Sequence, residues 1–217
     1  MSRLIDVSHT VEDGLITYKG LPAPLICDFL TREESRAMYS EGTEFYIGKI
    51  EMVANTGTYV DSPFHRYAEG KDISELPLES LADLEALVVR AGQERAIGEA
   101  AFDGLDVTGK AVIVATAWDR HWKTEQYFDG HPFLSRDAAR LLAESGAALV
   151  GIDSMNIDDT DDLERPAHSI LLGAGIPIAE HLCNLGGLPE RGFRFFAVPV
   201  KVKRFGTFPV RAFAMIG

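Results

Sequence analysis

Cysteine and long apolar segments are both scarce in this chain. Cys27 and Cys183 are the only cysteines among 217 residues and form no Cys-x-x-Cys pair, which argues against a disulfide framework and a zinc knuckle. No apolar run approaches the length of a membrane span, and the N-terminus lacks the apolar core of a signal peptide. We therefore expect a cytoplasmic protein with no membrane partner.

Positive charge is also limited. The chain has 21 Lys and Arg against 33 Asp and Glu, a formal net charge of −12 and a pI near 4.9. Nucleic acids are bound through clustered Lys and Arg, so we expect no nucleic-acid partner. The basic stretch Lys201-Val202-Lys203-Arg204 alternates with valine, which is typical of one solvated strand face.

Linkers, low-complexity segments and internal repeats are missing as well. A chain of 217 residues with 46% hydrophobic and 25% charged residues suits a globular domain with a sizeable core. We expect one domain spanning residues 1–217.

The clearest secondary-structure signals lie in the middle of the chain. Val112 to Ala115 is an apolar run of strand length, typical of a strand covered on both faces. A helix is predicted from Arg136 to Ser145, with Ser135 as its N-cap. Gly146 follows as its C-terminal stop, and Ala148 to Ile152 forms the next strand. This order predicts a βαβ unit with parallel strands and an α/β fold.

Alternation and turn residues predict the remaining elements. Gly14 to Pro24 is expected to be an irregular loop over a pocket or a subunit partner, and Ala96 to Phe102 a helix. A loop over Arg204 to Pro209 joins the last two strands. The other predicted strands are Leu4–His9, Ala23–Phe29, Phe45–Val53, Leu84–Arg90, Phe193–Val202 and Val210–Ile216.

One polar stretch, from Asn55 to His65, has the pattern of a site. If the chain is extended up to Asp61, alternate side chains from Asn55 onward share one face, and Gly57 leaves room for a ligand near the backbone. Pro63 ends the strand, which leaves His65 in the loop at its end. Tyr59 and Asp61 would then lie near His65.

This stretch resembles the signature of the putative cyclase superfamily, which includes bacterial kynurenine formamidases and isatin hydrolase. The family pattern is His-x-Gly-Thr-His-x-Asp-x-Pro-x-His, and the matching residues here are Gly57, Thr58, Asp61, Pro63 and His65. Asn55 and Tyr59 replace the two leading histidines. The resemblance implies a single α/β domain of the swivelling β/β/α type with a mixed sheet.

Two further segments carry the resemblance. His168, Leu172, Glu180, Leu182 and Leu185 match a family setting in which the His and Glu bind metal. The segment from Asp153 to Asp162 has the acidic composition of a calcium loop, but it fails the EF-hand pattern because Met155 is its third residue and Asp158 stands where glycine is required. Gly151-Ile152-Asp153-Ser154 instead resembles a family Gly-x-Asp-Ser. The acidic run after Ser154 is expected to be a solvated loop.

The resemblance also implies a metal-dependent hydrolase that acts on a small-molecule substrate. The ligands carried over are Asp61, His168 and Glu180, with Asn55 as a further oxygen donor, for one divalent ion per chain, zinc or manganese. We expect a homodimer or homotetramer.

Three residues of the signature are candidates for catalysis. His65 would be the proton shuttle, Thr58 would steady the oxyanion, and Tyr59 could act as an acid. Trp118, at the carboxyl end of a predicted strand, and His9, after the first strand, are the candidates for substrate binding.

The expected reaction is hydrolysis of a C–N bond in a small amide, an N-formyl aryl amine or a cyclic amide. Two alternatives stay open because Asn55 and Tyr59 replace histidines. The chain could bind a small molecule with no metal and no hydrolysis, with Tyr59 in the vacated metal position. It could also be a metal-independent enzyme that uses Tyr59 and His65 as acid and base. A serine hydrolase is disfavoured, since the sequence has no Gly-x-Ser-x-Gly.

Overall fold

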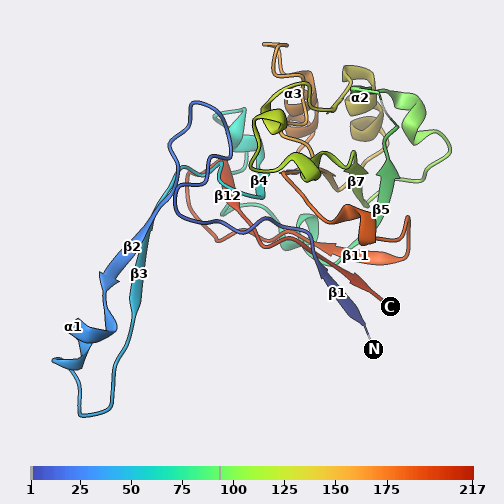
Figure 1. Cartoon of the computed structure of the whole chain (residues 1–217). Helices are drawn as coiled ribbons and strands as arrows, with labels where there is room; N and C mark the ends of the chain where they lie inside the picture. The colour runs from blue at the N-terminus through green and yellow to red at the C-terminus, as the bar shows by residue number, and fades with distance from the viewer. Residues whose placement is uncertain (1, 93) are drawn as a thin grey trace.

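The computed structural model describes residues 2–92 and 94–217, and its centre is one mixed sheet of nine strands (Figure 1). In spatial order the strands are β1 (Arg3–Asp6), β13 (Phe213–Ile216), β11 (Phe193–Phe196), β5 (Leu84–Arg90), β7 (Ala111–Ala115), β9 (Leu149–Ile152), β10 (Ile178–Glu180), β4 (Tyr59–Asp61) and β12 (Thr207–Pro209). Neighbouring strands β5, β7, β9 and β10 run parallel, whereas the strands on both flanks pair antiparallel.

The core occupies both faces of this sheet. Helices α2 (Arg136–Glu144) and α3 (Pro166–Gly173) lie side by side on one face (Figure 1). In β7, Val112 and Val114 pack into the cluster on the helix side, while Ile113 packs into the cluster on the other side. All three are fully buried. The predicted doubly covered strand and the predicted βαβ unit, β7–α2–β9, are confirmed, and so is the α/β fold with a mixed sheet.

The end signals of α2 act as predicted. Ser135 accepts a hydrogen bond from the Ala138 amide, and Gly146 follows the helix with a φ of 73°. That φ is in the left-handed region, where glycine is favoured.

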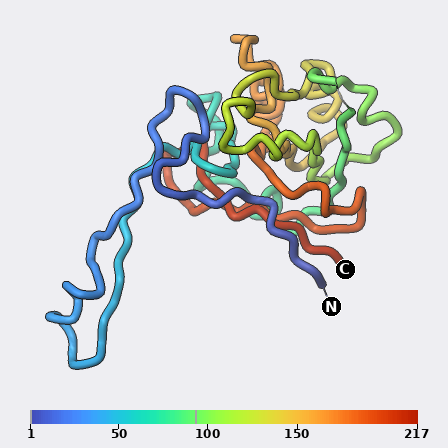
Figure 2. Tube along the Cα trace, in the orientation of Figure 1, coloured from blue at the N-terminus to red at the C-terminus, as the bar shows by residue number. Residues whose placement is uncertain are grey.

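A hairpin arm projects from the body of the molecule (Figures 1 and 2). It consists of β2 (Leu25–Leu30) and β3 (Ile47–Glu51), with the short helix α1 (Arg32–Arg36) near its tip. Several large apolar side chains on it are exposed, among them Phe29 at 72% and Ile50 at 48%. The arm therefore presents an exposed apolar surface outside the body of the molecule.

Several predicted elements need correction. The helix expected over Ala96–Phe102 is a short strand, β6 (Ala96–Ile97), followed by a 3-10 turn; β6 pairs with β8 (Phe133–Leu134). Part of the loop expected over Arg204–Pro209 is the edge strand β12.

Short 3-10 turns connect several of these elements. They are η1 (Pro63–His65), η2 (Leu78–Ser80), η3 (Glu99–Phe102), η4 (Trp118–His121), η5 (Glu125–Phe128) and η6 (Leu185–Gly187).

The expectation of an extended chain from Asn55 to Asp61 is correct only for the last three residues. Gly57 has a φ of 67°, which breaks the alternation before β4 begins at Tyr59. A Cβ at Gly57 would lie 2.9 Å from Cγ2 of Val11. The glycine is therefore explained by backbone conformation and close packing, and not by ligand access. No helix among residues 2–92 and 94–217 is long and apolar enough to cross a membrane.

Candidate active site

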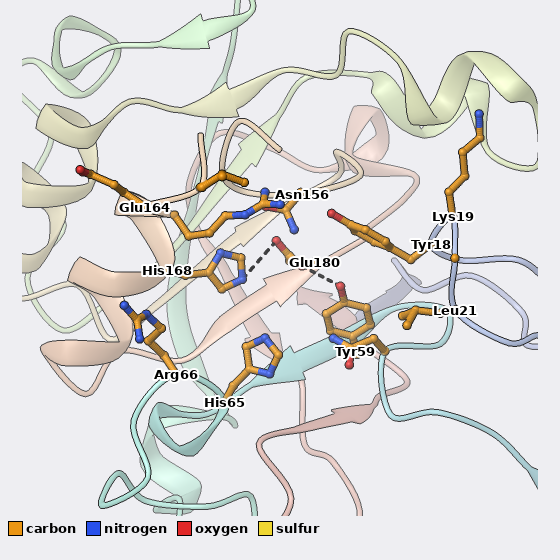
Figure 3. A pocket seen from close by; sticks show the side chains of 14 residues that line it. Tyr18, Lys19, Leu21, Tyr59, His65, Arg66, Asn156, Glu164, His168 and Glu180 are labelled. Atoms are coloured by element: carbon orange, nitrogen blue, oxygen red, sulfur yellow. Dashed lines mark hydrogen bonds and ion pairs between the residues drawn. The ribbon is translucent and has the colours of Figure 1, made fainter. Parts of the chain in front are cut away.

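A cavity of about 720 Å³ lies beside β4, β10 and α3 (Figure 3). Its size suits a small organic molecule. Residues 18–21 form part of its wall, which confirms that the irregular segment Gly14–Pro24 covers a pocket. The lining residues are Tyr18, Lys19, Gly20, Leu21, Asn55, Tyr59, His65, Arg66, Asn156, Leu163, Glu164, Arg165, His168 and Glu180.

Strand pairing places three buried polar side chains on one face of the sheet. In the antiparallel β4–β10 pair, Tyr59 is opposite Glu180, and Asp61 is two residues further along the same strand. Helix α3 brings His168 to this face: its Nε2 atom lies 3.6 Å from Oδ2 of Asp61 and 3.7 Å from Oε1 of Glu180. The structure therefore brings together Asp61, His168 and Glu180, which are far apart in sequence.

Asp61 is linked to His65 through Thr207. The Thr207 hydroxyl donates a hydrogen bond to Oδ1 of Asp61 and lies 2.9 Å from Nδ1 of His65. The hydroxyl has one proton, and its hydrogen bond to Asp61 uses that proton. Nδ1 of His65 must therefore be protonated and donate a hydrogen bond to the Thr207 oxygen. Nε2 of neutral His65 is then an unprotonated base on a ring that lines the cavity.

The approach of β12 to His65 depends on Gly206. A Cβ at Gly206 would lie 2.5 Å from Cα of His65, which is too close for any side chain. Only glycine lets Thr207 reach both His65 and Asp61.

Glu180 is held by a buried chain of hydrogen bonds. The Tyr59 hydroxyl donates to Oε2 of Glu180 at 2.7 Å, and the Ile157 amide donates to Oε1 at 2.6 Å. Nε2 of His181 lies 3.2 Å from the Tyr59 oxygen, and its Nδ1 lies 2.8 Å from the Tyr127 oxygen. Since Tyr59 gives its proton to Glu180, His181 must donate from Nε2 and accept from Tyr127 at Nδ1.

Burial determines which of these hydrogen-bonded side chains carry a proton. Burial, together with the charges of Glu180 and Asp61, raises the pKa of Tyr59 well above its usual value, so the phenol stays protonated. Burial also lowers the pKa of His181 to about 3, which keeps that imidazole neutral. Burial raises the pKa of Glu180 to about 7, although the nearby His168 charge opposes the rise.

His168 is oriented by Asp158. Nδ1 of His168 lies 2.7 Å from Oδ2 of Asp158, whose carboxylate also accepts the backbone amides of Ala167 and His168. This contact leaves Nε2 free to face Asp61 and Glu180. Burial opposes protonation, but the Glu180 charge and the contacts with Asp158 and Asp61 outweigh it and raise the pKa of His168 to about 10.

A divalent ion fits between Asp61 and His168. Oδ2 of Asp61 is buried and has no hydrogen-bond partner among the described residues, a cost that a bound cation would remove. The 3.6 and 3.7 Å separations from Nε2 of His168 are too long for hydrogen bonds. They match two ligand atoms on one ion, which are about 3.4 Å apart for tetrahedral bonds of about 2.1 Å.

A further geometric grouping includes His65. Ligand atoms of Asp61, His65 and His168 all lie within 4.8 Å of one another. In His65, however, Nδ1 is already engaged with Thr207. Of the two ring nitrogens of His65, Nε2 is therefore the one left without this contact, and Glu180 lies at the edge of the Asp61–His168 pair.

The other predicted site residues are spread over two regions. Asn55 lines the cavity together with Tyr59. Thr58 is buried and braces the backbone, since its hydroxyl donates to the His181 carbonyl at 2.5 Å and accepts from the His9 amide at 2.9 Å. The structure does not bring Thr58 to the cavity.

The two residues expected to bind substrate also lie outside the cavity wall. The indole of Trp118 donates to the Tyr127 carbonyl at 3.0 Å. The His9 ring stacks on Trp122 with 4.0 Å between ring centroids. Their substrate-binding roles remain predictions.

Three residues of the site are not among the residues that the sequence predicts for it. Thr207 lies where the sequence predicts a loop, and His181, which directly follows Glu180, belongs to no motif. The prediction of a solvated acidic loop after Ser154 is wrong for Asp158, which is fully buried. The position of Asp158 ten residues before His168 is too weak a signal to predict their contact.

Comparisons with known proteins identify relatives over the full chain. The profile of the family described as "Putative cyclase" matches residues 5–159. Kynurenine formamidase of Bacillus cereus (strain ZK / E33L) is 28% identical over 212 residues, which cover 97% of this chain and 96% of that protein.

Solved structures give the same fold. Isatin hydrolase A from Labrenzia aggregata has a TM-score of 0.83 at 21% identity, covering 99% of this chain and 94% of that one. At that identity the likeness concerns the fold alone. A structure described as a potential metal-dependent hydrolase with cyclase activity has a TM-score of 0.82 at 25% identity, with 100% and 99% covered.

Proposed function

The chain belongs to the cyclase family, and we propose that it is a metal-dependent hydrolase of a C–N bond in a small amide, an N-formyl aryl amine or a cyclic amide. The family resemblance drawn from Gly57, Thr58, Asp61, Pro63 and His65 is confirmed. A distant kinship with kynurenine formamidase, at 28% identity, supports the N-formyl aryl amine as the first substrate class to test.

The observation that carries the proposal is the unpaired, buried Oδ2 atom of Asp61 facing Nε2 of His168. One anionic oxygen and one imidazole nitrogen, with Oε1 of Glu180 beside them, form a ligand set for zinc or manganese. Asn55 lines the same cavity and could contribute an oxygen. A bound divalent ion would polarise the amide carbonyl and acidify a water molecule.

The protein's own residues would handle the protons. Nε2 of His65 would accept a proton from the attacking water, and the hydrogen bond from Nδ1 to Thr207 would hold the ring in the required tautomer. The protonated ring would then return that proton to the departing amine. The ionised Asp61 stabilises the cationic ring, because its Oδ1 lies 3.8 Å from Nδ1 of His65.

The experiment that tests this function measures hydrolysis of N-formylkynurenine by protein stripped of metal and then supplied with zinc or manganese. We expect activity only with the ion, and a loss of about 10²-fold or more in kcat for His65→Gln. His121→Gln is a matched control, since His121 does not line the cavity. Activity that is independent of the ion, or insensitive to His65→Gln, would contradict the proposal.

A second candidate is small-molecule binding without a metal or hydrolysis. One observation favours it: protonated His168, with its pKa raised to about 10, would itself balance the charges of Asp61 and Glu180. Protein that stays ion-free in excess zinc or manganese, yet binds small amides, would support this reading.

A further inference from the structure

Four charged side chains stand on the wall of the cavity around the ion site: Lys19, Arg66, Glu164 and Arg165. Two of them are already paired with residues that do not line the cavity. Lys19 forms a salt bridge with Glu125 at 2.8 Å, and Glu164 forms one with Arg136 at 2.5 Å. Their charges are therefore compensated before any ligand enters.

The other two charges, Arg66 and Arg165, have only neutral acceptors. Nε of Arg66 donates to the Ser169 hydroxyl at 3.2 Å, and Nη1 of Arg165 donates to the Asp159 carbonyl at 3.3 Å. Among the residues that the structure describes, no carboxylate oxygen lies within 4.0 Å of either guanidinium. The neutral contacts hold both side chains in place and leave both charges uncompensated.

Both arginines are positioned close to the reacting groups. Arg66 directly follows His65, and Figure 3 shows it on the same side of the cavity as His65 and His168. Arg165 is the N-cap of α3, three residues before His168, and is half-buried. An anionic group held by these side chains would place the rest of a small molecule next to the ion site.

The backbone at Arg165 gives an independent argument. Its φ of 49° and ψ of 61° are left-handed, a region that glycine or asparagine occupies more easily than arginine. Backbone geometry therefore does not explain an arginine at this position. Residues kept in such conformations are frequent at ligand sites, and Arg165 is the one among the non-glycine residues with positive φ in the described ranges whose side chain lines this cavity.

We propose that Arg165 and Arg66 form a carboxylate-binding subsite, so that the preferred ligands of the cavity are small aromatic acids. That such acids are also cleaved rests on the proposed function. The carboxylate-binding subsite itself does not, because the binding of an acid needs no hydrolysis. A planar carboxylate is the natural partner of a guanidinium, which can offer it two parallel N–H donors. The protein as a whole carries a formal charge of −12, so this local positive charge would select anions against the general field.

The test compares two fluorescent probes of nearly equal shape, 2-aminobenzoate and its neutral amide, 2-aminobenzamide, titrated into the full-length protein without added metal ion. We expect wild type to bind the acid at least about tenfold more tightly than the amide, and to lose that preference as salt rises. Arg165→Asn should weaken acid binding about tenfold or more and change amide binding little. Arg66→Gln should weaken acid binding in the same direction.

Two controls keep the result interpretable. Asparagine accepts left-handed backbone, so Arg165→Asn should fold with an unchanged or higher melting temperature. Arg140→Gln removes an arginine that is paired with Asp137 on α2 and should have no effect on either probe. Equal binding of the two probes by wild type, or unchanged acid binding in both cavity variants, would overturn the subsite. Loss of hydrolysis with intact selectivity would instead contradict only the proposed function.

Discussion

His65 and Asp61 are coupled through an intervening hydroxyl. Nδ1 of His65 and Oδ1 of Asp61 are 3.8 Å apart, too far for a hydrogen bond, and Thr207 contacts both atoms. The same hydroxyl thus fixes the tautomer of the proposed base and satisfies one oxygen of the proposed metal ligand. We therefore expect Thr207 to act as a positioning residue, although it does not line the cavity.

Thr207→Val removes this hydroxyl and keeps the side-chain shape. We expect kcat to fall by about tenfold or more, because His65 loses the acceptor that fixes its tautomer. The ion-free protein should also lose about 1–3 kcal/mol of unfolding free energy, because Oδ1 of buried Asp61 is left without a donor. Urea denaturation and steady-state kinetics measure the two effects. Thr207→Ser should preserve both quantities, and unchanged kcat in Thr207→Val would refute the positioning role.

The Tyr59→Phe variant distinguishes a structural role from an acid-catalyst role for Tyr59, which stands where the family signature has a histidine. Because the phenol stays protonated and donates to Glu180, we expect a structural role. The variant should lose about 1–3 kcal/mol of stability, keep its ion and retain activity within about tenfold. Complete loss of activity with normal ion content would favour Tyr59 as an acid catalyst.

The pH dependence of ion binding follows from His168. Its pKa is raised to about 10 in the ion-free protein, whereas an ion needs the unprotonated Nε2 atom. Ion affinity should therefore rise by about tenfold per pH unit between pH 8 and pH 9.5, with release of one proton. Calorimetry in buffers of different ionisation enthalpy measures that proton.

The stability of ion-free protein should show the opposite trend. A raised folded-state pKa of His168 stabilises the fold fully below its ordinary value of 6.5 and no longer does so once pH has risen through about 10. Unfolding free energy should thus fall between pH 8 and pH 10, and this slope should be smaller in His168→Gln. Equal slopes in the two proteins would show that His168 is not the titrating group.

We predict that the protein self-associates through the hairpin arm. Phe29 and Ile50 are exposed apolar side chains on its two strands, and we expect a second copy of the chain to cover them. Light scattering should then give two or four times the chain mass of 23.8 kDa. Phe29→Glu should lower that mass, whereas Glu33→Gln on α1 should not. A monomeric wild type would rule out the expected homodimer or homotetramer.

Sequence reasoning succeeded where the signal was local. The apolar run Val112–Ala115 and the cap residues Ser135 and Gly146 predicted β7 and α2, because burial periodicity and helix ends are determined by neighbouring residues. The family resemblance pointed to Asp61, His168 and Glu180, which the structure brings together.

The failures depend on contacts between distant segments. Thr207 becomes part of the site only because the three-residue strand β12 pairs with β4 in the register Thr207↔Asp61. Asp158 is buried because it accepts the first amides of α3, although its acidic neighbours make the segment look solvated. A short edge strand and a buried acid have the composition of a loop, so local pattern cannot distinguish them.

Metal content tests the central claim, that Asp61 and His168 hold a catalytic ion, more directly than any other measurement. Protein purified without a chelating tag is analysed by elemental mass spectrometry beside Asp61→Asn, which keeps the side-chain shape and removes the charge. We predict about one zinc or manganese per wild-type chain and at least about tenfold weaker binding in the variant. A wild type that holds no ion even when zinc or manganese is supplied, or an Asp61→Asn protein that holds it equally well, would contradict the claim.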